Sequence, residues 1–321
     1  MKGEFSMKHM RRFFVLLLAL LLAILPVCAE NVRTTEVYDI SQDTGSLTVR
    51  FVDIGISDGG AGDFIILTSP EGLVMTIDSG HPWSKEYVLG ALESMGITRI
   101  DYMVISHYHH DHVANTPYLM RNFEVGAVYT SYLDDPYESY YTSYMDAIAE
   151  MKLNHIKLAE GDAFYFGDKV LVEVFGPTKD FTYLDTSREG PYDTVFVNNN
   201  SLILKFTYGE STFLTAGDLY SGQENKVVAA YGELLDVDLL KISHHGWPTS
   251  SSPKWRTATS PEIAVIPASG IIDRSIMRKL LKKGEAYVTG CSGTVCVRLY
   301  EDGTNDVITE KDYSYDWLLQ E

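Results

Sequence analysis

Residues 107–112 read His107-Tyr108-His109-His110-Asp111-His112. They directly follow the apolar run 101–106, which predicts a short β-strand over 103–106. The end of such a strand would present imidazoles and a carboxylate around one point. Neutral imidazole and carboxylate together suit zinc, manganese or iron. The spacing His-x-His-x-Asp-His therefore favours a metal site over a histidine-rich surface loop.

Three other groups of polar residues also stand close behind apolar runs. His81 follows the run 73–77, Asp218 follows 213–217, and His244 with His245 follows 239–243. Asp218 alone would also suit a turn or a helix cap. Because loops held by rigid strands commonly carry binding residues, the groups together predict one shared site.

The ordered motifs resemble those of the metallo-β-lactamase superfamily over about residues 48–300. These motifs are Asp78-Ser79-Gly80, His107-x-His109-x-Asp111-His112, Gly217-Asp218 and Ser243-His244-His245-Gly246. The resemblance implies an α/β protein with the αββα four-layer sandwich of the metallo-β-lactamase fold. The hydrophobic pattern also predicts strands at 47–54, 64–68, 73–77, 103–106, 169–175, 202–207, 211–215, 239–243 and 263–267, and helices at 85–95, 139–151, 223–231 and 274–283.

Within the superfamily the chain is most similar to the hydrolase domain of ComEC-type competence proteins. Secreted phosphorylcholine esterases are similar in the same segments. The segments that carry the likeness are 51–55 with Gly62-Asp63, then 198–202 with Asn198 and Asn200, and finally 244–246 with the serines 250–252. The likeness implies a metal-dependent hydrolase that acts on phosphate esters.

The resemblance also implies two divalent cations, Zn²⁺ or Mn²⁺, about 3.5–4 Å apart with a shared attacking hydroxide. The expected ligands are His107 and His109 for the first cation, Asp111, His112 and His245 for the second, and Asp218 for both. Asp111 and His244 are the expected catalytic residues, with His244 contacting substrate or donating a proton. The sequence does not decide which of His244 and His245 binds the cation. Asp78 would orient a ligating imidazole or cap a turn.

Lactamase-type members bind the first cation with a third histidine, and this chain lacks a histidine at the corresponding position. His155 is the one histidine in the relevant interval, and its sequence setting favours a structural or surface role. Asn198 or Asn200 would fill that position with an amide oxygen, unless both asparagines are turn formers. An amide oxygen would bind the cation less tightly and tolerate manganese better. Trp247 would stack on a substrate or pack as an ordinary aromatic residue.

Four segments are expected along the chain. Residues 1–29 predict a secretion signal, 30–46 a leader, 47–302 the hydrolase domain and 303–321 an acidic aromatic tail. Cleavage after Ala29 predicts a secreted or extracytoplasmic protein with no membrane span, whereas an uncleaved signal would act as a membrane anchor. Lipidation at Cys28 is disfavoured by the residues before it. Cys291 and Cys296 would flank the turn of a β-hairpin, either as a disulfide or as two free thiols.

The formal net charge of the chain is −18. Residues 1–29 hold four basic residues and one acidic residue, so the cleaved chain would carry −21. This negative charge opposes tight binding of nucleic acid. It therefore slightly favours a small phosphate ester over nucleic acid as the substrate. The leading hypothesis is a phosphodiesterase. The alternatives are an acyl hydrolase of β-lactams or lactones, disfavoured by the missing histidine, and a non-catalytic binding module, disfavoured by the intact motifs.

Overall fold

The computed structural model describes residues 34–57, 60–180 and 194–320. The expected signal at 1–29, with Cys28, lies outside these residues. Fifteen strands form two sheets within the described part of the chain. No helix among the described residues is long and apolar enough to cross a membrane.

The first sheet has eight strands in the order β15-β14-β1-β2-β3-β4-β5-β6. Their bounds are β1 Ser46–Phe51, β2 Ile65–Thr68, β3 Val74–Ile77, β4 Arg99–Val104, β5 Glu124–Ser131, β6 Asn154–Leu158, β14 Val295–Tyr300 and β15 Asn305–Thr309. β1, β2 and β3 pair antiparallel, whereas β3 to β6 are parallel. β15 pairs with β14, so the segment beyond Gly303 continues the sheet.

The second sheet has seven strands in the order β13-β12-β11-β10-β9-β8-β7. Their bounds are β7 Ala163–Phe166, β8 Val170–Gly176, β9 Ile203–Tyr208, β10 Ser211–Thr215, β11 Leu239–Lys241, β12 Ile263–Ile266 and β13 Glu285–Val288. β10 to β13 are parallel, and β7 to β10 are antiparallel.

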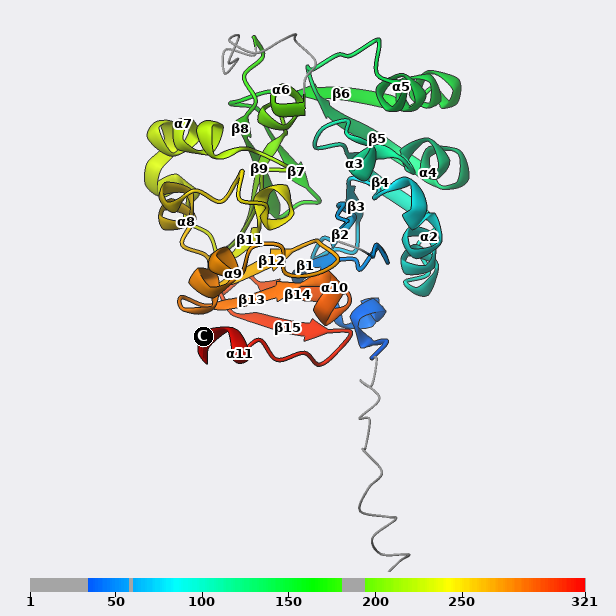
Figure 1. Ribbon diagram of the computed structural model, residues 1–321. Helices are drawn as coiled ribbons and strands as arrows, with labels where there is room; N and C mark the ends of the chain where they lie inside the picture. Colours follow the sequence, from blue (N-terminus) through cyan, green and yellow to red (C-terminus); the bar gives the residue numbers. More distant parts are fainter. Residues whose placement is uncertain (1–33, 58–59, 181–193, 321) are drawn as a thin grey trace, which may run out of the picture. The chain divides into compact units, whose positions relative to one another are not determined.

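Helices cover the outer faces of the two sheets (Figure 1). The chain forms α2 Lys85–Ser94, α3 His110–Val113, α4 Thr116–Asn122, α5 Ser139–Met151, α6 Thr194–Asn199, α7 Ser221–Tyr231, α8 Pro253–Thr259, α9 Arg274–Leu281, α10 Thr289–Ser292 and α11 Trp317–Gln320. Alternate strand residues face opposite sides. In β2, Ile65 and Leu67 therefore join the core between the sheets, while Ile66 packs under α2. A third core lies beneath α7, α8 and α9. The expected αββα sandwich is confirmed.

The expected hairpin around the cysteines is wrong. β13 and β14 belong to different sheets, and α10 connects them. Both strands read as short β-rich runs, so the local pattern alone could not reveal that the chain changes sheets between them. Cys291 is partly buried and Cys296 is buried, and both are free thiols. The disulfide alternative is therefore not supported.

Candidate metal centre

The loops with the conspicuous histidines and aspartates follow four strands in the middle of the two sheets. Asp78 follows β3, the loop 107–112 follows β4, Asp218 follows β10, and His245 follows β11. Because β3 is parallel to β4 and β10 is parallel to β11, the carboxyl ends of each pair lie at one edge. An isolated bridge between Ala61 and Ala268 connects loops of the two sheets.

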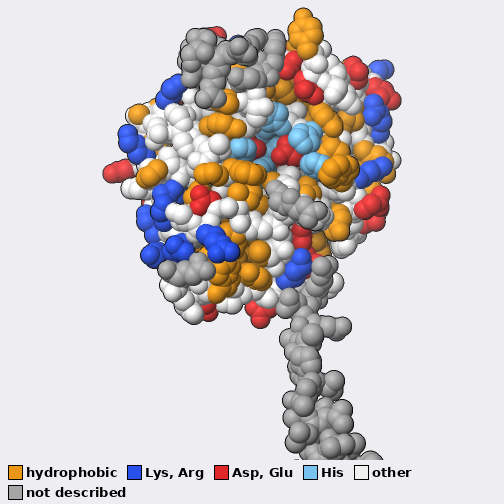
Figure 2. Space-filling view, viewed as in Figure 1, with side chains coloured by type: hydrophobic (Ala, Val, Ile, Leu, Met, Phe, Trp, Pro, Cys, Tyr) orange, Lys and Arg blue, Asp and Glu red, His pale blue; other side chains and the backbone are white. Residues whose placement is uncertain are grey.

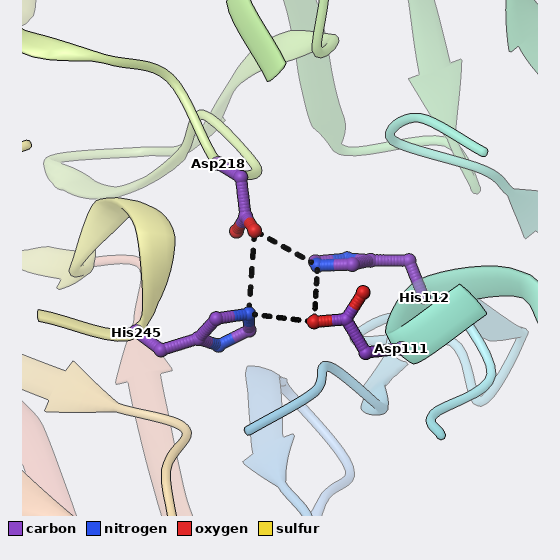
Figure 3. A group of neighbouring side chains, drawn as sticks. All are labelled: Asp111, His112, Asp218 and His245. Atoms are coloured by element: carbon purple, nitrogen blue, oxygen red, sulfur yellow. Dashed lines mark ion pairs between the residues drawn. The ribbon is translucent and has the colours of Figure 1, made fainter. Parts of the chain in front are cut away.

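Four of the expected ligands meet at one point (Figure 3). Oδ2 of Asp218 lies 3.2 Å from Nε2 of His112 and 3.3 Å from Nε2 of His245. Oδ2 of Asp111 lies 3.5 Å from Nε2 of His245 and 4.0 Å from Nε2 of His112. Two imidazoles and two carboxylates that converge in this way form a suitable donor set for a divalent transition metal.

Hydrogen bonds on the far side of each ring orient the two imidazoles. Nδ1 of His112 lies 2.7 Å from Oδ2 of Asp78. The other carboxylate oxygen of Asp78, Oδ1, accepts a hydrogen bond from the backbone N–H of Ser106. Nδ1 of His245 lies 2.8 Å from the carbonyl oxygen of Pro267. Both Nε2 atoms are buried and have no hydrogen-bond partner among the described residues. Buried polar atoms seldom lack a partner, so these two nitrogens fit metal coordination.

His107 and His109 lie beside this group of four. Nε2 of His107 is 3.1 Å from Nδ1 of His109, and the rings of His107 and His112 have centroids 4.1 Å apart. Burial, followed by the neighbouring imidazoles, lowers the pKa of His107 well below its ordinary value. Burial likewise lowers the pKa of His109. Both rings are therefore neutral at pH 7, as metal coordination requires.

Of the asparagines expected in place of a third histidine, Asn198 lies in α6 and Asn200 in the turn after it, and the residues that follow bond to the same loops. Leu202 donates its N–H to the carbonyl oxygen of Ser106, and Asp218 donates its N–H to Oγ of Ser201. Asn198 is 1% exposed, and its Oδ1 atom has no hydrogen-bond partner in the part of the chain that the structure describes. Oδ1 of Asn200 also lacks one, but its amide nitrogen donates to the carbonyl oxygen of Phe196.

Two charged residues at the centre had no role assigned from the sequence. Lys241 is fully buried, and its Nζ lies 2.5 Å from Oδ2 of Asp63, 3.4 Å from Oδ1 of Asp218 and 2.9 Å from the carbonyl oxygen of Gly217. Asp63 also places Oδ1 3.3 Å from Nδ1 of His245. The signal for Lys241 in the sequence was a lysine within an apolar run that leads into the His-His-Gly motif. Asp63 stood within a motif that carried the resemblance.

The two adjacent histidines adopt unusual backbone conformations. His244 has φ 48° and His245 has φ 53°, both in the left-handed region that residues with a side chain rarely occupy. These turns place His245 in the group of four, while Nε2 of His244 lies 4.0 Å from Asp218. His244 stacks on Tyr220 with ring centroids 4.8 Å apart. Trp247 follows this turn and is 42% exposed.

The charges of the centre suit a cation. Burial opposes ionisation of Asp218, but His245, His112 and Lys241 lower its pKa well below the ordinary value. Burial also opposes protonation of His112 and His245, yet Asp218 and the other carboxylates raise the pKa of both. The carboxylates thus hold positive charge on both imidazoles. A divalent cation can replace those protons, because it supplies positive charge to the same side chains.

A buried carboxylate holds the serine loop behind the His-His-Gly turn. Glu224 of α7 accepts the N–H groups of Ser251 at 2.6 Å and Ser252 at 2.7 Å. Burial raises its pKa to about 7, although these hydrogen bonds oppose the shift. A glutamate with a raised pKa keeps its proton in the folded state after the unfolded state has lost it. Its contribution to stability therefore falls as the pH rises from about 4.5 to about 7.

We expect this dependence to disappear in Glu224→Gln. The difference in free energy of unfolding, wild type minus variant, should fall between pH 4.5 and 7 and be constant above pH 7. Urea denaturation of the metal-free proteins at a series of pH values measures it. Glu233→Gln, on the exposed segment after α7, is the control and should give a difference without this slope. A wild type–Glu224→Gln difference that is flat across this range would contradict the interpretation.

Residues 58–219, about half of the chain, match the family described as the metallo-beta-lactamase superfamily. The chain therefore belongs to the metallo-β-lactamase superfamily, in agreement with its two-sheet fold and its histidine–aspartate centre. Within that superfamily it is of the ComEC type. It is 23% identical to ComE operon protein 3 of Bacillus subtilis over 236 residues, which are 67% of this chain and 28% of that protein.

Competence protein ComA of Neisseria gonorrhoeae is 37% identical over 86 residues, which are 27% of this chain and 12% of that protein. The chain thus spans less than a third of either curated relative. Among solved structures, the metallo-β-lactamase fold protein YhfI of Bacillus subtilis is 14% identical with a TM-score of 0.48. That likeness covers 82% of this chain and all of YhfI.

Proposed function

We propose that the protein is an exported phosphodiesterase that uses two divalent cations, Zn²⁺ or Mn²⁺. The observation that carries the choice of reaction is the amide oxygen of Asn198 in α6, which is buried and has no hydrogen-bond partner among the described residues. The residues just after α6 bond to Ser106 and Asp218. In this proposal the Asn198 oxygen takes the place of the third imidazole of lactamase-type members. When bound, the cations would supply Lewis acidity to a phosphoryl oxygen and to the attacking water.

The side chains have distinct proposed roles in this reaction. His107, His109 and Asn198 would hold one cation, and Asp111, His112 and His245 the other, with Asp218 between them. Asp78 fixes the ring of His112, and Pro267 fixes that of His245. Lys241 fixes Asp218 from the side opposite His112 and His245, so that Oδ2 faces the imidazoles. Because burial lowers the pKa of His244 to about 4, its ring meets the substrate as a neutral hydrogen-bond donor.

The place of action is part of the proposal. The basic residues, apolar run and small residues within 1–29 support export through a secretion signal. The substrate would then be an extracytoplasmic phosphate ester, either a small molecule or a nucleic acid.

The test compares two chromogenic substrates on the same protein. Bis-p-nitrophenyl phosphate reports diester cleavage, and a chromogenic cephalosporin reports acyl hydrolysis. Both are measured with manganese- and zinc-loaded protein, with His109→Ala as the variant expected to lose activity. His155→Ala is the matched control, because His155 lies in β6 and bonds to Thr130 instead of the centre.

We expect diester cleavage that falls at least about a hundredfold in His109→Ala and is retained in His155→Ala. The cephalosporin should stay intact. Turnover of the cephalosporin without diester cleavage would instead establish the acyl hydrolase. Metal-loaded protein inert toward both substrates, and toward a wider set of phosphodiesters, would contradict the phosphodiesterase and favour the binding module.

A further inference from the structure

One region of this acidic protein has the opposite charge. Residues 253–285 contain seven basic and three acidic residues, a net charge of +4 within a chain of net charge −18. The region comprises α8, β12 and α9. Figure 2 shows basic side chains gathered over α8 and α9, on the same face as the histidines and acidic residues of the metal centre.

A cavity of about 270 Å³ lies within this basic region. Its lining includes four cations from two helices and the turn after them, together with apolar residues such as the buried Leu280. The cations are Arg256, Lys279, Lys282 and Lys283. Among the described residues of the lining, Glu285 is the one carboxylate, and it accepts a hydrogen bond from the hydroxyl of Tyr287.

The three lysines are available to bind an anion. Lys279, Lys282 and Lys283 are exposed, and none forms an ion pair within the described part of the chain. Exposed lysines elsewhere, such as Lys169, do pair with a carboxylate. Arg256 donates to the carbonyl oxygen of Ser251, in the loop that Glu224 holds next to the His-His-Gly turn. The basic cavity, hereafter the α8–α9 cavity, is therefore connected through that loop to the metal centre.

We propose that the α8–α9 cavity binds the backbone of a phosphodiester polymer whose neighbouring segment reaches the metal centre. This inference rests on the proposed phosphodiesterase function and specifies its substrate as a chain. A polymer with one negative charge per repeat is repelled by the protein as a whole, so it needs a local cluster of unpaired cations to anchor it. The basic side chains over α8 and α9 lie on the same face as the histidines of the metal centre, so one chain can contact both (Figure 2).

Two other occupants fit the region less well. A single phosphate group would engage one or two of the four cations and leave the others unpaired. A membrane surface requires apolar side chains that can insert beside the cations. Of the large hydrophobic residues that are exposed among the described residues, none lines the cavity.

The experiment measures binding and cleavage separately. Fluorescence anisotropy in EDTA gives the affinity for a labelled oligothymidine and for a poly(glycerol phosphate) of similar length, across a series of salt concentrations. The test variant combines Lys279→Glu, Lys282→Glu and Lys283→Glu. The control variant combines Arg121→Glu, Lys157→Glu and Lys169→Glu, which changes the net charge equally on other, partly exposed surfaces. Circular dichroism establishes that each variant is folded.

We expect the test variant to bind at least one of the two polymers at least about tenfold more weakly at low salt, and its salt-dependence slope to fall by about 2. The control should change affinity severalfold at most. Bis-p-nitrophenyl phosphate should be cleaved equally by wild type and test variant, because a single diester has no neighbouring segment to anchor. The polymer whose affinity falls in the test variant shows whether the bound phosphodiester backbone is that of a nucleic acid or of a poly(glycerol phosphate).

Equal losses in the test and control variants would overturn the α8–α9 cavity as an anchor, since only net charge would then matter. Binding of inorganic phosphate or of anionic vesicles that depends on the three lysines, without polymer binding, would also overturn it. A lysine-dependent affinity for a polymer in a protein that cleaves no diester would support the anchor and contradict the phosphodiesterase. Diester cleavage without lysine-dependent polymer binding would support the phosphodiesterase and contradict the anchor.

Discussion

Replacing Asp218 with asparagine is expected to lower diester hydrolysis at least about a thousandfold and to remove most of the bound metal. Among the carboxylate oxygens, Oδ2 of Asp218 is the nearest to Nε2 of both imidazoles, 3.2 Å from that of His112 and 3.3 Å from that of His245. Asparagine keeps the size of the side chain but removes the negative charge that attracts both cations. The measurements are the initial rate with bis-p-nitrophenyl phosphate and the metal content after dialysis.

Asp43→Asn is the matched control for Asp218→Asn. Asp43 is equally buried and lies 2.7 Å from Arg50, remote from the metal centre. Its replacement should lower stability without changing the metal content per folded molecule. If Asp218→Asn retained the wild-type metal content and rate, Asp218 could not be a shared ligand.

The second large effect is expected from Lys241→Met. Burial disfavours the charge of Lys241, but Asp63 and Asp218 raise its pKa, so the amine is charged in the folded protein. Its removal leaves two buried carboxylates short of one positive charge, which should destabilise the metal-free protein by about 3–5 kcal/mol. Bound cations would supply part of the missing charge. The rise in Tm on adding Mn²⁺ should therefore be larger in Lys241→Met than in wild type.

Arg50→Met separates this effect from a general loss of a buried ion pair. Arg50 is also fully buried and paired with an aspartate, yet it does not contact the metal centre. It should lower the Tm with and without Mn²⁺ by similar amounts. The same parallel loss in Lys241→Met would mean that Lys241 stabilises the fold but does not balance the charge of the centre.

Much of the centre could be predicted because its residues stand directly behind apolar strands. The loop 107–112, Asp218 and the His-His-Gly motif each follow such a run, and strands that run parallel bring their ends together. The predicted bounds were also close where the pattern was strong. The helix expected at 139–151 is α5, and the strand expected at 211–215 is β10.

Other features depend on contacts that a linear pattern does not encode. β6 and β7 lie at sheet edges, are only partly buried and lack a long apolar run, so the pattern did not predict them. Lys241 is a charged residue in a fully buried strand, and its role depends on Asp63, which is distant in sequence. The choice between His244 and His245 depends on two left-handed residues in succession.

The metal content of the protein shows directly whether these loops bind cations. Purified protein is stripped with chelator, loaded with Mn²⁺ or Zn²⁺, dialysed and analysed for metal, alongside the His112→Ala and His155→Ala variants. Wild type and His155→Ala should retain about two equivalents, and His112→Ala about one or fewer. Wild-type protein that retains no metal under these conditions, while remaining folded, would contradict the central claim that these loops form a metal centre.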